Sequence, residues 1–522
     1  MAETIIESKR RGGRNARRAL RAAPLEEADR AIRPGLEGGS YAPLNAGQIA
    51  AIHAAVMEVL ADVGLADAIP SCIEITTAKG AYLNAHGRLC FPKSLVEDTI
   101  AMAARHFPMC AQDPAFDIEP WGKKVHFGTA GAAVHMVDPR GREYRESNLR
   151  DLYDIARMVD QLDNIHFLQR PIVARDMVDP RDLDINTLYA CISGTKKHIG
   201  TSFVLPEHVD EALKMLHEVA GSEAAWRARP FVSQSNCFVV PPLKFAEDAC
   251  RCLEVAVRGG MPVLLLAAGQ AGATSPAALA GAVVQEVAEV LAGLVYVNCI
   301  EPGAKAIFGT WPFVSDLRTG AMSGGSGEQA LLMAACAQMG QHYDLPVGVA
   351  SGMTDSKLPD AQAGYEKGYN HALVANSGAN MIYEAAGMHA SLLGFCLESL
   401  VIDNDIIGAA LRTVRGLEID TDTLSVETMR QVCFEGPGHF LGSEQTLARM
   451  QKDYAYPVVG DRASPKEWVE QGSTDILDRA EIKTREILAT HFPRHISEAM
   501  DAALRAQYPI LLPREQMMPV ES

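Results

Sequence analysis

The chain has 522 residues, of which 48% are hydrophobic, so it can bury a sizeable core in one large domain with additions or in two to three domains. Its formal net charge of −17 argues against nucleic acid as a partner, because phosphates would be repelled. The sequence has no continuous run of about 18 apolar residues and no pattern of a secretory leader, so we expect a cytoplasmic protein with no membrane partner.

The first 147 residues are expected to precede the main domain in two parts. Residues 1–40 contain an arginine-rich segment from Lys9 to Arg21, which we interpret as a basic flexible arm or as an arm that wraps an acidic neighbouring subunit. In residues 41–147, apolar spacing predicts helices over 45–63 and 92–106. Alternating apolar residues over 125–144 predict a hairpin, which makes this part an α+β cap.

From residue 148 the pattern alternates helix and strand, which is typical of a parallel sheet with helical crossovers. A helix precedes each of seven predicted strands, at 165–169, 197–203, 231–238, 262–267, 306–310, 346–350 and 381–384. The fold class is therefore α/β, and the count favours a TIM (β/α)8 barrel over 148–400 whose eighth strand the pattern does not identify. Residues 401–522 are predicted to be helical and to pack on the barrel or between subunits.

A glycine-rich loop follows the strand at 306–310 and holds two aromatic residues and an arginine. Trp311 and Phe313 could face a cation, and the guanidinium of Arg318 could fork onto a carboxylate. This combination suggests a small zwitterion as the ligand. The alternative is that the aromatic residues cover the barrel rim and that Arg318 forms a surface ion pair with Asp316.

In such a barrel, the residues at the strand ends would face one bowl. They are polar and almost uncharged: Gln169, Ser202, Gln234, Asn236, Gln270, Thr310, Trp311, Ser351, Met353 and Glu384. A metal site would need more histidines and carboxylates, and the eleven cysteines form no C-x-x-C pair, so we expect no protein-bound metal. No dinucleotide or Walker fingerprint is present. The bowl suits methyl transfer from a quaternary ammonium to an external metal nucleophile, which requires positioning and desolvation.

Several dispersed motifs resemble the trimethylamine methyltransferase family: Arg10-Arg-Gly-Gly-Arg14, Phe127-Gly-Thr-Ala-Gly131, Asp154-Ile-Ala-Arg-Met-Val-Asp160, Ser323-Gly-Gly-Ser-Gly-Glu-Gln329 and Gly438-His-Phe-Leu441. The resemblance covers nearly the whole chain. It implies a TIM barrel and a cognate corrinoid protein, which carries cobalamin and accepts the methyl group. The trimethylamine enzymes contain pyrrolysine, and this chain has only the twenty ordinary residues. Its segment 311–320 is most similar to the branch without pyrrolysine, which includes glycine betaine methyltransferases.

The resemblance also implies roles for individual residues. Arg318 would bind the substrate carboxylate, and Trp311, Phe313 and Tyr365 would face the trimethylammonium group. From the predicted bowl, Gln169 and Asn236 are further candidates for substrate binding, and Gln329 and Glu384 are the possible catalytic residues.

We therefore expect an enzyme that moves a methyl group from a quaternary amine, with glycine betaine favoured, to the Co(I) of a corrinoid protein. Within the same reaction, the substrate could instead be carnitine, γ-butyrobetaine, proline betaine or a sulfonium analogue. In a different class, the barrel could bind a betaine without catalysing a reaction. The arginine-rich arm and the helical tail suggest a homo-oligomer.

Overall fold

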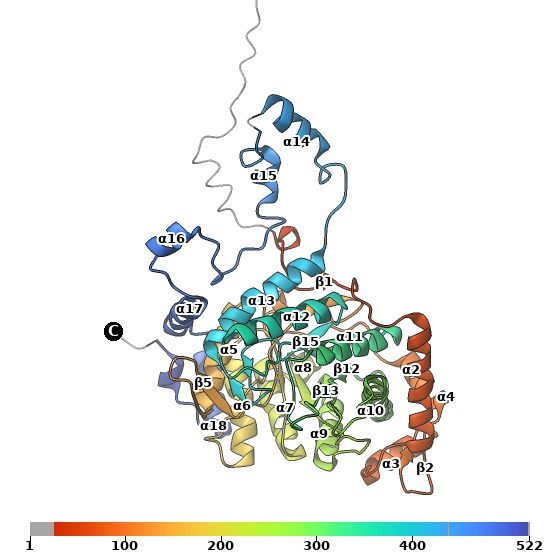
Figure 1. The fold of residues 1–522 in the computed structure, drawn as a ribbon. Helices are drawn as coiled ribbons and strands as arrows, with labels where there is room; N and C mark the ends of the chain where they lie inside the picture. Colours follow the sequence, from red (N-terminus) through yellow and green to blue (C-terminus); the bar gives the residue numbers. More distant parts are fainter. Residues whose placement is uncertain (1–25, 437, 520–522) are drawn as a thin grey trace, which may run out of the picture.

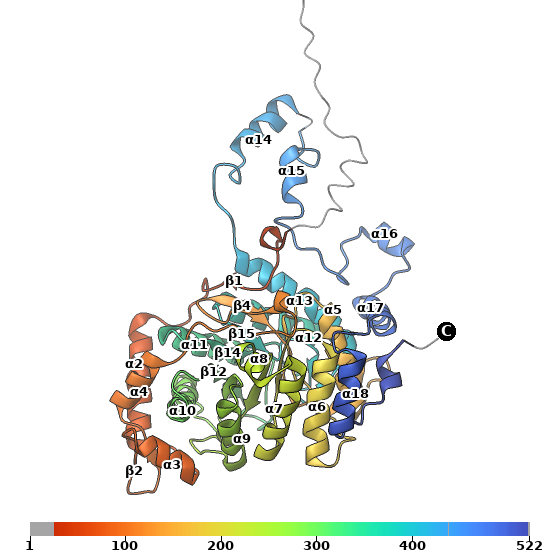
Figure 2. The same ribbon diagram turned by 180° about the vertical axis from the view of Figure 1, so that it is seen from behind.

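The computed structural model describes residues 26–436 and 438–519. The arginine-rich segment from Lys9 to Arg21 lies outside the described residues. The described chain forms a barrel that carries helical additions on two opposite flanks and a projecting arm (Figure 1, Figure 2).

Parallel strands of the described chain curl into a closed barrel, which confirms the predicted TIM (β/α)8 fold. Each strand pairs in parallel with the next, and the last strand pairs with the first. A parallel bridge between Gly128 and Phe167 closes the circle. The barrel strands are β4 (Lys124–Phe127), β7 (Phe167–Gln169), β8 (His198–Thr201), β9 (Val232–Asn236), β10 (Val263–Ala267), β12 (Ala306–Thr310), β14 (Val347–Ala350) and β15 (Met381–Tyr383).

Helices cover the outside of the barrel, one after each strand. Apolar faces of these helices pack on strands that are themselves buried, so the core lies between the two layers. The barrel helices are α5 (Leu149–Gln161), α6 (Pro180–Gly194), α7 (Pro206–Ala220), α9 (Glu247–Arg258), α10 (Leu279–Ile300), α11 (Gly327–His342), α12 (Ala361–Asn376) and α13 (Leu397–Arg415), and the short α8 (Glu223–Ala228) follows α7.

The strand that the sequence pattern left unplaced is β4, the first of the barrel. It pairs in parallel with β15, with Met381 opposite His126, and its other edge continues into the bridge to Phe167. Residues 125–127 were therefore wrongly assigned to a hairpin, because a lone strand before an insertion resembles the first arm of one. The barrel also includes α13 as its last helix, so it runs from 124 to 415 instead of from 148 to 400.

Short-range capping explains where the barrel helices begin. The side chain of Asn148 accepts from the Asp151 backbone N–H at 3.0 Å, and Asp151 accepts in return from the Asn148 N–H, so α5 begins with a capping box. Helix α12 is capped by Asp360, whose carboxylate accepts from the N–H of Ala363 at 3.0 Å. These caps fix where each preceding loop ends and its helix begins.

A small sheet joins the loops that follow the first and last barrel strands. Its hairpin consists of β5 (His135–Asp138) and β6 (Glu143–Glu146), and β5 pairs in parallel with β17 (Gly394–Phe395). Strand β16 (Met388–His389) completes the sheet beside β17. The loops after β10 and β12 are joined in the same way, through β11 (Gln270–Ala271) and β13 (Phe313–Val314).

The N-terminal residues form a layer against α10 (Figure 2). The layer includes α2 (Ala46–Glu58), continued by the π-helical η2 (Val59–Val63), and α3 and α4 pack on the same barrel helix. The remaining elements before β4 are η1 (Glu27–Asp29), β1 (Leu36–Glu37), α3 (Pro70–Thr77), β2 (Tyr82–Leu83), β3 (Leu89–Cys90), α4 (Lys93–Met102) and η3 (Pro114–Phe116).

Two helical segments, 46–63 and 279–300, are long and apolar enough to cross a membrane by length and composition. In α10 the apolar window is 83% buried inside the protein, which is the position of a core helix. In the segment 46–63, Ile52, Val56 and Leu60 are buried, although only 22% of its window is buried.

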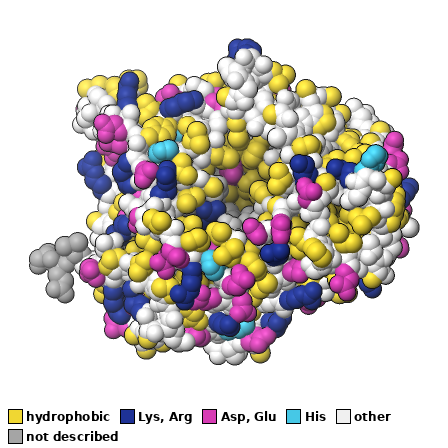
Figure 3. All heavy atoms as spheres, turned by 90° about the horizontal axis from the view of Figure 1, so that it is seen from below, with side chains coloured by type: hydrophobic (Ala, Val, Ile, Leu, Met, Phe, Trp, Pro, Cys, Tyr) yellow, Lys and Arg dark blue, Asp and Glu magenta, His cyan; other side chains and the backbone are white. Residues whose placement is uncertain are grey.

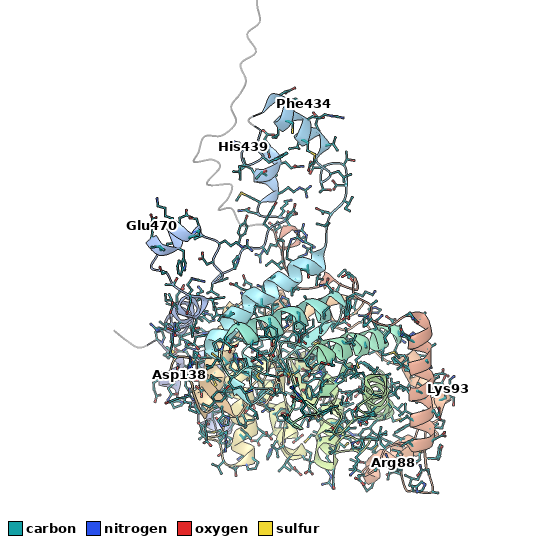
Figure 4. All side chains as sticks on the ribbon, viewed as in Figure 1. Arg88, Lys93, Asp138, Phe434, His439 and Glu470 are labelled. Atoms are coloured by element: carbon teal, nitrogen blue, oxygen red, sulfur yellow. The ribbon has the colours of Figure 1, made fainter. Side chains whose placement is uncertain are left out.

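After α13 the chain leaves the barrel as an arm and then returns along α5 and α6. In the arm, which we define as residues 416–436 and 438–457, Phe434 lies far from the barrel and is 84% exposed (Figure 4). On the return, Arg157 of α5 donates to the Leu488 carbonyl oxygen at 2.8 Å. The elements after α13 are α14 (Val426–Arg430), η4 (Gln431–Glu435), α15 (Glu444–Arg449), α16 (Pro465–Glu470), α17 (Ile476–Thr490), α18 (Glu498–Gln507) and η5 (Arg514–Met517).

Candidate active site

A cavity of about 480 Å³ opens at the carboxyl ends of the barrel strands. Figure 3 shows a hollow in the face seen from below, walled mainly by hydrophobic side chains. In TIM barrels, this end of the strands carries the chemistry. The lining residues come from the ends of β4, β7, β8, β9, β10, β12 and β15 and from the following segments: Ala130, Gly131, Ala132, Gln169, Arg170, Ser202, Phe203, Ser235, Asn236, Cys237, Ala249, Leu266, Ala268, Trp311, Phe313, Glu384, Leu392 and Leu393.

One wall of the cavity is built by the loop after β15. Residues Ala390, Ser391 and Leu392 all have φ between 50° and 77°, in the left-handed region that non-glycine residues rarely adopt. The Ala390 and Ser391 N–H groups donate to the carbonyl oxygens of Ser356 and Thr354, both at 2.9 Å, and these bonds help to hold the run in place. The backbone of this wall is therefore strained, and hydrogen bonds to neighbouring residues hold it in place, as is common at functional sites.

Trp311 and Phe313 both line the cavity, as the sequence predicted for residues after the 306–310 strand. The indole of Trp311 is 4% exposed, and its ring centroid lies 5.3 Å from that of Tyr383. The backbone N–H groups of Trp311 and Phe313 donate to the carbonyl oxygens of Ala267 and Gly269, both at 2.9 Å. Two aromatic rings are thus fixed beside the cavity, where they can attract a cation.

Glu384 supplies a carboxyl group to the same cavity. It follows β15 directly with a φ of 59°, and it is 1% exposed. Its Oε2 atom has no hydrogen-bond partner within the described chain. Burial raises the pKa of Glu384 to about 8, because an ionised carboxylate loses its hydration there. A cation in the cavity would favour the ionised form.

Two amides, Gln169 and Asn236, complete the predicted part of the lining. A methyl group at Gly200 would lie 1.6 Å from Oε1 of Gln169, so a glycine at this position makes room for that side chain. Asn236 Oδ1 and both side-chain polar atoms of Gln234 are buried without partners in the described residues. Buried amides of this kind are usually hydrogen-bonded. Asn236 lines the cavity, so its Oδ1 is available to a ligand or to water there.

Arg170 lines the cavity and was not selected from the sequence. It immediately follows Gln169 at the end of β7, so the rule that selected Gln169 could also have found it. Its Nη2 donates to the Ser202 hydroxyl oxygen at 3.0 Å, and its buried Nε has no partner among the described residues. Loss of hydration lowers the pKa of Arg170, but a guanidinium stays charged at physiological pH.

Three predicted site residues do not line the cavity. The side chain of Arg318 is 88% exposed and forks onto Asp316, with Nη2 at 2.7 Å from Oδ2, which holds the pKa of Asp316 at about 2. Tyr365 is 60% exposed on α12. Gln329 is buried in the first turn of α11, where its Oε1 has no partner within the described chain. Their roles in binding or catalysis stay predictions.

The described residues contain no group of three or more histidine, cysteine and acidic side chains that could hold a metal ion. Cys237 also lines the cavity, and it is exposed to solvent. The arrangement can bind and orient a small charged molecule and remove water from it.

Comparison with known proteins matches residues 10–510 to the family model for trimethylamine methyltransferase. A trimethylamine methyltransferase of Desulfitobacterium hafniense is 31% identical over 472 residues, which cover 90% of this chain and 94% of that one. A glycine betaine methyltransferase of the same species is 27% identical over 473 residues, covering 89% and 96% of the two chains.

The crystal structure of the monomethylamine methyltransferase of Methanosarcina barkeri matches with a TM-score of 0.49 and 11% identity, covering 89% of this chain and 90% of that one. The family model and the relatives above 30% identity each extend over most of the chain. The chain therefore belongs to the trimethylamine methyltransferase family.

Proposed function

We propose that the protein transfers a methyl group from a quaternary amine that also bears a carboxylate, with glycine betaine favoured, to the Co(I) of a corrinoid protein. The observation that carries this proposal is a single cavity at the barrel mouth that combines fixed aromatic rings, one carboxyl group and one guanidinium. The likeness to a glycine betaine methyltransferase over 89% of the chain supports it further.

In this reaction the bond between the methyl carbon and nitrogen breaks, and its electron pair stays on nitrogen. The amine leaves neutral, so the reaction itself needs no general acid. The chain itself orients the substrate and excludes water. A corrinoid on the partner protein would supply the nucleophile that takes the methyl group.

The binding of the cation has to be balanced against the loss of its charge. Positive charge on nitrogen disappears as the methyl group departs, so a strong grip on the ammonium group would stabilise the bound substrate more than the transition state. Aromatic rings contribute about 0.5–2 kcal/mol each to cation binding, which is a moderate grip. Trp311 and Phe313 are therefore suited to orient the ammonium group.

The test is to follow absorbance while the purified protein is mixed with cob(I)alamin and one methyl donor at a time. The donors are glycine betaine, carnitine, γ-butyrobetaine, proline betaine, a sulfonium analogue and trimethylamine. Formation of methylcobalamin from a carboxylate-bearing quaternary amine, and not from trimethylamine, is the expected result. If neither free cobalamin nor the cognate corrinoid protein is methylated with any donor, the reaction is refuted and a betaine-binding barrel remains.

We also propose that the protein forms a homo-oligomer through the arm at residues 416–436 and 438–457. Its apolar side chains are exposed, including Leu417 at 84%, Leu441 at 79% and Phe434 at 84%. Exposed apolar surface that is contiguous commonly marks an interaction site. Light scattering of the full chain is expected to give a multiple of the chain mass, and Phe434→Glu with Leu441→Glu is expected to lower it; a monomeric parent protein would contradict the proposal.

A further inference from the structure

We infer that Arg170 binds the carboxylate of the substrate, and that the cavity orients a zwitterion with its carboxylate at Arg170 and its ammonium group beside Glu384, Trp311 and Phe313. This inference rests on the proposed function, which it deepens by naming the residue that selects carboxylate-bearing amines. It differs from the expectation that Arg318 has this role.

The ionisable side chains of the cavity are few. Among the described residues that line the cavity, Arg170 and Glu384 are the only ones with ionisable acidic or basic side chains other than the thiol of Cys237. The two do not form an ion pair with each other in the described chain: Glu384 Oε2 has no partner, and Arg170 donates to Ser202. The cavity thus presents one cationic and one acidic group, each available to a ligand.

These two groups extend from strand ends that lie close together in the barrel. Arg170 follows β7 and Glu384 follows β15, and the single strand β4 lies between them in the barrel. Neighbouring strands are about 4.8 Å apart, so the two strand ends stand about 10 Å apart before their side chains extend. Because both side chains line one cavity between these strand ends, a molecule that carries both charges can contact both groups.

Arg170 has hydrogen-bonding capacity that the described chain does not fill. A guanidinium has five N–H donors, and a carboxylate matches two of them in a forked pair. Its Nε is buried without a partner in the described residues. The nearby carboxylate of Asp184 is engaged elsewhere, since it accepts from the Val204 N–H at 2.8 Å and contacts the His208 ring at 2.7 Å. A substrate carboxylate would satisfy Arg170 in a place where water is scarce.

Arg318 provides a matched comparison within the same protein. Its guanidinium already makes the forked pair with a carboxylate, that of Asp316, at 2.9 and 2.7 Å, and it is largely exposed. Binding a substrate there would require this pair to break, and an exposed charged contact gains little. Arg170 is the arginine whose environment lacks a carboxylate partner and which faces the cavity.

The experiment is isothermal titration calorimetry of the full chain with glycine betaine and γ-butyrobetaine, which have a carboxylate, and with choline and tetramethylammonium, which have none. Arg170→Gln is expected to weaken binding of the two carboxylate compounds by about tenfold or more, the effect of a lost charged hydrogen bond. Binding of tetramethylammonium should stay within about twofold of the parent value. Arg318→Gln should leave the binding of all four compounds near the parent values.

Further variants separate binding from folding. Arg170→Lys keeps the charge without the fork and should recover part of the lost affinity. Ser202→Ala removes the hydroxyl that orients Arg170 and should weaken betaine binding by less than Arg170→Gln does. Circular dichroism and thermal melting check that each variant is folded.

The inference is overturned if folded Arg170→Gln binds glycine betaine and γ-butyrobetaine as the parent does, or loses tetramethylammonium equally. It is also overturned if Arg318→Gln shows the selective loss, or if the parent protein binds no carboxylate compound. The binding measurement does not depend on turnover. Binding that depends on Arg170, without formation of methylcobalamin, would refute the proposed reaction and support the inference. Methyl transfer that does not depend on Arg170 would support the proposed reaction and refute the inference.

Discussion

Replacing Glu384 by Gln should remove a pH dependence from cation binding. Burial raises the pKa of Glu384 to about 8, so about one-tenth of this group is ionised at pH 7 and about nine-tenths at pH 9. If the ionised carboxylate attracts the ammonium group, affinity should rise by up to about tenfold between these pH values. Glutamine is close in size and does not titrate, so binding to Glu384→Gln should be independent of pH over this range.

Calorimetry with tetramethylammonium measures this effect without the complication of a substrate carboxylate. Titrations at pH 7 in two buffers of different ionisation enthalpy give the number of protons released on binding. Since a bound cation favours the ionised form, the parent protein should release nearly one proton per cation at pH 7, and Glu384→Gln should release none.

Glu289→Gln is the matched control, because burial also raises the pKa of Glu289, to about 7, and this residue does not line the cavity. Its variant should retain both the proton release and the rise in affinity. Equal affinity of the parent protein at pH 7 and 9, or unchanged proton release in Glu384→Gln, would show that Glu384 does not contact the cation.

Three further outcomes are expected. Lys367 and Asp403 form a buried pair at 2.5 Å, so Lys367→Met should lower the free energy of unfolding by about 3–5 kcal/mol in urea titrations, and an unchanged midpoint would contradict this. Protonated Glu384 favours the folded state below its ordinary pKa of 4.5, and this stabilisation is lost as pH rises through about 8, so Glu384→Gln should melt progressively higher than the parent between about pH 5 and 9. Trp311→Leu should weaken tetramethylammonium binding by about 0.5–2 kcal/mol in calorimetry, while Trp311→Phe should retain most of it; equal affinity in Trp311→Leu would exclude the ring as a contact.

Most of the barrel could be predicted because its strands and helices alternate with strong local signals. Strands such as β10, with five consecutive buried residues, and capped helices such as α5 appear close to their expected bounds. The first strand could not be found in this way, because both its parallel partners are distant in sequence and its own neighbours form a real hairpin. Helices α3 and α8 were also missed; both are short, with eight and six residues.

The site was predictable only as far as strand ends determine it. Five predicted residues line the cavity: Gln169, Asn236, Trp311, Phe313 and Glu384. Arg318 and Tyr365 lie on a surface loop and an exposed helix position, and sequence alone cannot distinguish an arginine that reaches a cavity from one that pairs with the acid two residues earlier. The strand-end rule could have selected Arg170 as a lining residue, but its contact with Ser202 and the cavity that it shares with Glu384 required the structure.

The position of β4 in the sequence also determines when the barrel can close during synthesis. One edge of β4 pairs with β15, and residues 126 and 381 are opposite each other across that pair. At roughly 5–20 residues per second, the ribosome needs roughly 10–50 seconds to make the intervening segment. Throughout that interval, this edge of β4 has unpaired backbone groups that could bond to another strand. The first strand of the barrel therefore keeps one open edge until the last strand has been made.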